Sequence, residues 1–268
     1  MKIKTFIQRH PVTSYFLLAF FISWGGSLAV LGPKFIRGET YQLTDSLLAL
    51  LAMLAGPSLT GITLTAIVDG RAGLRELFSR MARWRVKIRW YAVALLTPPV
   101  LILAVLLVLS RLVSLVFTPN FLALGIAYGL LCGFFEETGW MGYAFPKMQM
   151  KHSALAASLI LGVLHGTWHV VAGYLGASGN LGIYWLPNFI AMWIIGMTAM
   201  RVLIVWVYSH TGSVLLTQLM HASSTGFLVI LSPSPISPVN ETLWYAVYAV
   251  VLWVVVAIVI TKYGKCLV

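Results

Sequence analysis

Cys132-Gly133-Phe134-Phe135-Glu136-Glu137-Thr138-Gly139-Trp140-Met141-Gly142-Tyr143 is an apolar stretch that contains two adjacent carboxylates. The chain has only 7 acidic residues in total, and residues 119–135 carry no charge at all. In the hydrocarbon core of a bilayer each carboxylate costs roughly 3 kcal/mol on insertion scales. Ionisable residues at such positions usually have a partner and a function. We therefore take this stretch as the candidate functional site.

The composition predicts a polytopic membrane protein. Of the 268 residues, 60% are hydrophobic and 9% are charged, and the mean hydropathy is +0.91; soluble domains are about 25% charged. The net charge of +11 does not indicate nucleic acid binding, because the basic residues lie between apolar runs, as in cytoplasmic loops. Cys132 and Cys266 give no disulfide framework. No cleavable signal peptide is expected, since the first apolar run is too long and follows a basic end.

Eight apolar segments are long enough to cross a core of ~30 Å at ~1.5 Å per residue. They cover about residues 11–31, 45–68, 91–117, 121–145, 154–175, 184–208, 214–231 and 242–261. Gly32-Pro33 is predicted to end the first of them. We expect an all-α bundle of about eight transmembrane helices, forming a single integral membrane domain over residues 1–268 that embeds in membrane lipid.

Residues 69–90 form the only long polar segment and contain 7 basic residues. Leu74, Leu77, Phe78 and Met81 recur at i, i+3, i+4 and i+7, which predicts an amphipathic helix on the anionic cytoplasmic leaflet. An ordinary loop that fixes topology is the alternative. With eight spans this segment falls on the same side as both termini and nearly every Lys and Arg. We expect that side to be the cytoplasmic side of the plasma membrane.

Ionisable groups recur in the second half of the chain: Glu136 and Glu137 in the fourth span, His165 and His169 in the fifth, and His221 in the seventh. Adjacent helical residues point about 100° apart, so only one of the two glutamates is expected to point straight at a given site. The two histidines of the fifth span lie at i and i+4, on one face. Carboxylates with imidazoles can activate water, bind a divalent metal or relay protons. A single intramembrane histidine can also simply join helices by a hydrogen bond.

Three short motifs in this region resemble those of the CPBP family, which comprises the CAAX prenyl endopeptidases and the bacteriocin-processing (Abi) proteins. The family patterns are EExxxR, FxxxH and HxxxN (or HxxxB, where B is asparagine or aspartate). The corresponding stretches here are Glu136-Glu137-x-x-x-Met141, Leu164-His165-Gly166-Thr167-Trp168-His169 and Leu219-Met220-His221-Ala222-Ser223-Ser224-Thr225. Together they place the catalytic motifs within residues 132–231.

The resemblance implies an intramembrane endopeptidase, with its site open to the cytoplasm, that cleaves a peptide or membrane-protein substrate. By position, Glu136 would activate the water, and Glu137 would support the site. His169 and His221 would hold the water, stabilise the oxyanion or ligate zinc or another divalent metal; a mechanism without metal is equally compatible. Trp140, within the first motif, is a supporting residue.

Three positions depart from the family patterns. Met141 replaces the arginine and cannot pair with Glu137, so we expect Glu137 to be protonated. His165 replaces the phenylalanine and is either a third imidazole ligand or a filler of aromatic size. Thr225 replaces the asparagine or aspartate four residues after His221 and keeps only a hydroxyl. These departures concern catalysis more than fold, so a non-catalytic immunity or scaffold protein is one alternative. A proton-coupled transporter that uses Glu136 and the histidines as a relay is the other. The sequence specifies no oligomeric state.

Overall fold

The computed structural model describes residues 3–268, and all regular structure in that range is helical. The α-helices are α1 (Ile3–Arg9), α2 (Pro11–Arg37), α3 (Leu43–Val68), α4 (Gly70–Met81), α5 (Ile88–Leu112), α6 (Leu124–Gly139), α7 (Phe145–Gln149), α8 (Ala154–Trp168), α9 (Val170–Leu181), α10 (Trp185–Phe189), α11 (Met197–Thr211), α12 (Val214–Ile230) and α13 (Pro238–Tyr263). Two π-helical segments, Trp140–Ala144 and Ile190–Gly196, and three 3-10 turns, Leu115–Phe117, Gly182–Tyr184 and Gly264–Cys266, complete the set.

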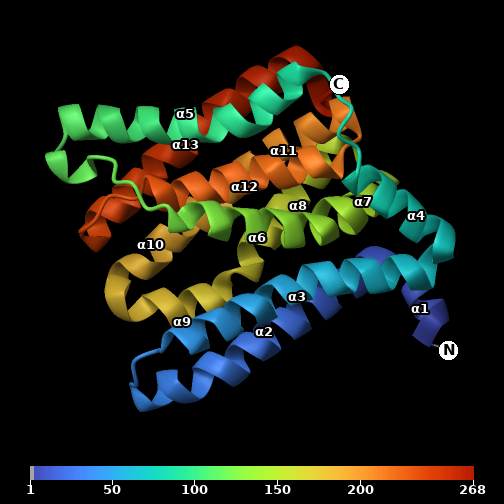
Figure 1. The fold of residues 1–268 in the computed structure, drawn as a ribbon, viewed down its shortest axis with the longest axis horizontal. Coiled ribbons are helices and arrows are strands. Elements are labelled where there is room, and N and C mark those ends of the chain that lie inside the picture. The colour runs from blue at the N-terminus through green and yellow to red at the C-terminus, as the bar shows by residue number, and fades with distance from the viewer. Residues whose placement is uncertain (1–2) are drawn as a thin grey trace.

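The all-α polytopic architecture is confirmed. In the described residues, five helical segments are long and apolar enough to cross a membrane: Pro11–Arg37, Leu43–Val68, Ile88–Leu112, Val170–Thr211 and Pro238–Cys266. Ala154–Trp168 and Val214–Ile230 are apolar but shorter. Each of the eight predicted spans coincides with a helix or a broken helix, and the long helices run side by side (Figure 1).

Two predicted boundaries are wrong. Helix α2 continues through Pro33 to Arg37, and its last turn is closed by Gly38, which has a φ of 67°. The fifth predicted span breaks at His169, where α8 ends and α9 turns toward α2 (Figure 1). The carbonyl of Trp168 at this break accepts a hydrogen bond from the Trp24 indole at 2.8 Å, which stabilises the change of direction.

Small residues bring α6 and α12 into close contact. Gly125, Gly129 and Gly133 are spaced by four along α6 and face the backbone of α12. A Cβ atom on Gly125 would lie 2.6 Å from the Gly226 carbonyl oxygen. Spacing of this kind allows two helical backbones to approach in a membrane. The contact holds the Glu136-Glu137 end of α6 against α12.

A second close contact joins α8 to α11 and to the π-helical segment Ile190–Gly196 that precedes it. A Cβ atom on Gly162 would lie 2.6 Å from the Cα of Thr198, and one on Gly166 would overlap the Trp193 carbonyl. The face of α8 that carries His165 therefore lies directly on α11.

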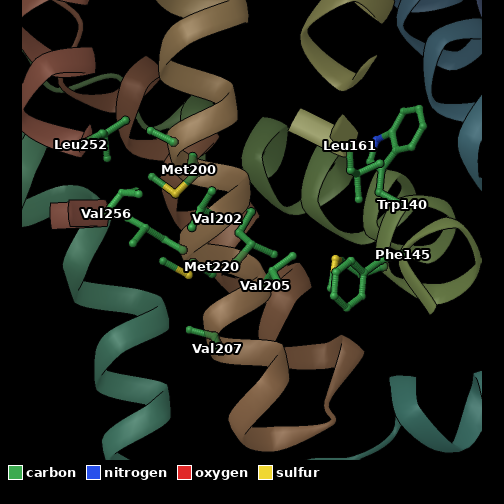
Figure 2. Packing of buried hydrophobic residues seen from close by; sticks show 14 of the residues in the cluster. Trp140, Phe145, Leu161, Met200, Val202, Val205, Val207, Met220, Leu252 and Val256 are labelled. Atoms are coloured by element: carbon green, nitrogen blue, oxygen red, sulfur yellow. The ribbon is translucent and has the colours of Figure 1, made fainter. Parts of the chain in front are cut away.

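Helix α11 is buried on every face. All side chains from Met197 to Val205 are buried. Figure 2 shows the α11 side chains Met200, Val202, Val205 and Val207 between Leu252 and Val256 on one side and Trp140, Phe145 and Leu161 on the other. A helix in such surroundings is expected to be apolar throughout. It nevertheless carries Arg201, whose side chain has no exposed surface.

The basic segment contains the predicted helix, α4, with Leu77 fully buried against the bundle. Arg80 of this helix donates to the Gly142 carbonyl at 2.9 Å and to the Tyr208 hydroxyl at 2.8 Å. These bonds fix α4 to the end of the bundle where α1 and the C-terminus also lie (Figure 1).

Candidate active site

Five buried ionisable side chains from four helices form one connected cluster. They are Glu136 and Glu137 of α6, His165 of α8, Arg201 of α11 and His221 of α12. Arg201 binds Glu137 in a bidentate manner, from Nη1 to Oε2 at 2.6 Å and from Nη2 to Oε1 at 2.8 Å. The Nδ1 atom of His221 lies 2.6 Å from the same Oε1. Paired guanidinium–carboxylate bonds of this length are typical of an ionised carboxylate.

The expectation that Glu137 lacks a cation is therefore wrong. Met141 makes no ion pair, but Arg201 reaches Glu137 from a position 64 residues away in the sequence. Sequence reasoning left Arg201 out of the site. Its signal was present nonetheless, because it is the only Asp, Glu, Lys or Arg between Lys151 and Glu241.

Both carboxylates reach the same histidine, contrary to the expectation that only one points at the site. Nδ1 of His221 contacts Glu137, and its Nε2 lies 3.8 Å from Oε2 of Glu136. Glu136 also lies 2.7 Å from Nε2 of His165. The imidazole of His221 spans the gap between two side chains that point in different directions from α6.

His165 is central to the cluster. Its Nδ1 atom is 2.7 Å from Nη2 of Arg201, and its Nε2 atom is 2.7 Å from Oε2 of Glu136. The Trp140 ring lies against it, with the ring centroids 5.0 Å apart. His165 thus connects Arg201 to Glu136, and Trp140 limits its movement.

His169 lies next to the cluster but makes none of its hydrogen bonds. Its ring stacks on Trp193 with a centroid separation of 3.7 Å, and its Nε2 atom is buried without a hydrogen-bond partner among the described residues. Together with Glu136, His221 and Thr225, it lines a cavity of about 410 Å³.

The rest of this cavity is mostly apolar and includes Phe189, Met192, Met200, Leu228, Tyr245 and Leu252. Its far end is lined by Leu122, Leu181, Ser232 and Glu241, in or next to the connections that lie opposite α1 and the C-terminus (Figure 1). The cavity therefore extends from Glu136, near the end of α6, toward these connections. Cytoplasmic termini and a site that opens to the cytoplasm remain predictions.

The cluster contains side chains of the types that bind metal ions. By proximity, Glu136, His165 and His221 could hold one, because one ligand atom from each lies within 4.8 Å of the others; His169, expected as a ligand with His221, is outside this group. The guanidinium of Arg201 can only donate, so Nδ1 of His165 must accept the hydrogen bond. The ring proton of a neutral His165 is then on Nε2. A protonated Nε2 cannot bind a metal. Two ligands then remain, one fewer than catalytic zinc sites use, so the group does not fit.

Comparison with known proteins gives matches in the part of the chain that contains this cluster. Residues 118–227 match the family model described as type II CAAX prenyl endopeptidase Rce1-like. The chain is 28% identical over 119 residues to CAAX prenyl protease 2 of Methanococcus maripaludis, which is 42% of this chain and 41% of that protein. The match thus spans about two fifths of the length of this curated relative.

Proposed function

We propose that this chain, which belongs to the CPBP family of CAAX prenyl endopeptidases, hydrolyses a peptide bond of a membrane-associated substrate by means of a glutamate-activated water. The observation that carries the proposal is the division of roles between the two carboxylates. Glu137 is neutralised by Arg201 and is not among the residues that line the cavity, whereas Glu136 lines the cavity and has no cation as a direct hydrogen-bonding partner.

Glu136 is the general base in this proposal. It removes a proton from a water in the cavity beside it, and the water oxygen attacks the carbonyl carbon of the scissile bond. Its own position is held by His165, which donates to Oε2 and leaves Oε1 for the water. When the carbon–nitrogen bond breaks, Glu136 returns the proton to the leaving amine.

Two imidazoles line the cavity near Glu136. Nε2 of His221 lies 3.8 Å from Oε2 of Glu136, close enough for both to contact one water. We assign His169, with its unpaired Nε2, to the carbonyl oxygen of the substrate, where a donor would stabilise the developing negative charge. Thr225 lines the same cavity and offers a hydroxyl. No step requires a metal ion, in keeping with the poor fit of the donor set.

The substrate is proposed to be a peptide with an apolar or lipid-modified end. The cavity is largely apolar, and the relative's name describes a protease for CAAX prenyl sequences. We place the chain in the plasma membrane as a single integral domain. Its basic end is assigned to the cytoplasm because Lys and Arg gather there. The substrate then approaches from the opposite side.

A non-catalytic role on the same fold is the second candidate. The observation that favours it is Thr225, which stands where the family pattern has an asparagine or aspartate and cannot supply an amide or a carboxylate.

The experiment is cleavage of a fluorogenic peptide that ends in a prenylated Cys-a-a-X sequence, with the products identified by mass. Glu136→Gln is expected to lower kcat/KM by at least roughly 10²-fold, since loss of a general base removes a 10²–10⁴-fold contribution. Glu76→Gln, a matched change on the exposed face of α4, should leave kcat/KM unaltered. If Glu136→Gln keeps the activity of the wild type, as the control variant should, Glu136 is not the base. Wild-type protein that cleaves no prenylated or unmodified apolar peptide would favour the non-catalytic role.

A further inference from the structure

One guanidinium, that of Arg201, links the two halves of the cluster. It donates to both oxygens of Glu137 and to Nδ1 of His165, with all three distances between 2.6 and 2.8 Å. Its side chain is fully buried, and it comes from a helix that is otherwise uncharged between Met197 and Thr211.

The first consequence concerns His165. Arginine has no acceptor atom, so the 2.7 Å contact requires an unprotonated Nδ1 on His165. In a neutral imidazole the proton is then on Nε2, which lies 2.7 Å from Oε2 of Glu136. The contact with Arg201 therefore makes His165 a donor to Glu136.

The second consequence concerns His221 and is transmitted through Glu137. Because Arg201 pairs with Glu137, that carboxylate is ionised and can only accept. Nδ1 of His221, 2.6 Å from Oε1, must then carry a proton and donate it. Nε2 of His221 lies 3.8 Å from Oε2 of Glu136, which is too far for a hydrogen bond. No contact therefore requires a second proton, on Nε2, and the imidazole of His221 is neutral.

We propose that Arg201 is the positioning residue of this site: it determines that the proton is on Nε2 in His165 and on Nδ1 in His221. The two imidazoles then present opposite properties to Glu136, a donor on one side and an acceptor on the other. Arg201 also supplies to Glu137 the cation that Met141 cannot. The catalytic consequence rests on the proposed function, but the assignment of protons does not.

Lysine cannot replace Arg201 in this arrangement. Its single nitrogen is a point charge without the planar fork of a guanidinium. It can neutralise Glu137, but it cannot bind both carboxylate oxygens and Nδ1 of His165 in the observed geometry. Arg201→Lys therefore separates the two consequences: His221 keeps its proton on Nδ1, while His165 loses its fixed tautomer.

The test is the ¹⁵N NMR spectrum of histidine-labelled full-length protein in detergent micelles, with signals assigned from His165→Gln and His221→Gln. Protonated and unprotonated ring nitrogens have well-separated shifts. In wild type, the protonated nitrogen should be Nε2 of His165 and Nδ1 of His221. Arg201→Lys should change the His165 signals alone, and Arg111→Lys, the matched change at the exposed end of α5, should change neither. A wild-type His165 protonated on Nδ1, or His165 signals unaltered in Arg201→Lys, would overturn the proposal.

A kinetic comparison tests the same assignment on the prenylated peptide. Arg201→Lys should lower kcat by roughly 10²-fold with little change in KM, because a wrong tautomer disturbs the base rather than substrate binding. Arg201→Met added to Glu137→Gln should lower kcat at least tenfold further, since His165 is then also released. An equal kcat in Glu137→Gln and the double variant would mean that Arg201 acts only through Glu137. If wild type cleaves nothing, the NMR result still decides the proposal independently of the proposed function.

Discussion

Removing Arg201 tests how much the buried cluster contributes to stability. Arg201→Met keeps most of the side-chain volume but leaves the Glu137 carboxylate buried without a cation. Breaking a buried ion pair by removing one partner costs about 3–5 kcal/mol. The pair here has two charge-assisted bonds of 2.6 and 2.8 Å and no exposed surface on either side chain, which argues for the upper part of that range. Glu137→Gln in the Arg201→Met background removes the uncompensated charge. The double variant should therefore be more stable than Arg201→Met alone, with a coupling energy of about 3 kcal/mol or more.

The assay is equilibrium unfolding in mixed micelles, followed by tryptophan fluorescence, for wild type, both single variants and the double variant. The control cycle is Lys34→Met with Asp45→Asn, a partly exposed pair for which a coupling of about 0–1 kcal/mol is expected. The reasoning would be refuted if the changes in unfolding free energy of the two single variants sum, within about 0.5 kcal/mol, to the change in the double variant. Sites that do not interact give such additive effects.

Two further predictions concern packing and access. Gly133→Ala should lower the free energy of unfolding by about 1–3 kcal/mol, because its Cβ would lie 2.6 Å from a backbone nitrogen of α12; Gly25→Ala, with open space around it, should be neutral or stabilising by up to about 1 kcal/mol in the same unfolding assay. In a Cys132→Ala background, a membrane-impermeant maleimide added to intact cells should label Ser232→Cys at the far end of the cavity, whereas Cys266 should react only after permeabilisation. Labelling of Cys266 alone in intact cells would reverse the proposed orientation.

Much of the fold follows from local sequence patterns. Apolar length located the spans, and the spacing of Leu74, Leu77, Phe78 and Met81 located helix α4. Two predicted helix ends differ from the structure. Helix α2 was predicted to end at Pro33, but it accommodates this proline and continues to Arg37. The fifth apolar run was predicted to be continuous, but it breaks at His169, where the distant Trp24 indole donates to the carbonyl of Trp168.

The candidate site could be predicted in composition but not in connectivity. Glu136, Glu137, His165 and His221 stood out as ionisable residues in apolar spans, and the structure brings these four together. Arg201 is linked to them only by the packing of α8 and α11, which depends on glycines far from Glu137 in the sequence. A lone charge in an apolar span indicates that a partner exists, but it does not identify that partner.

The reaction is proposed to use a glutamate-activated water without a metal ion. The most direct measurement is metal content and peptide cleavage determined on the same purified sample, before and after exhaustive chelation, beside His165→Ala. We predict that cleavage is unaffected by chelation and does not follow the metal content. About one zinc per chain, lost together with activity on chelation and in His165→Ala, would contradict the account, because His165 would then be a ligand and Arg201 could not hold its proton on Nε2.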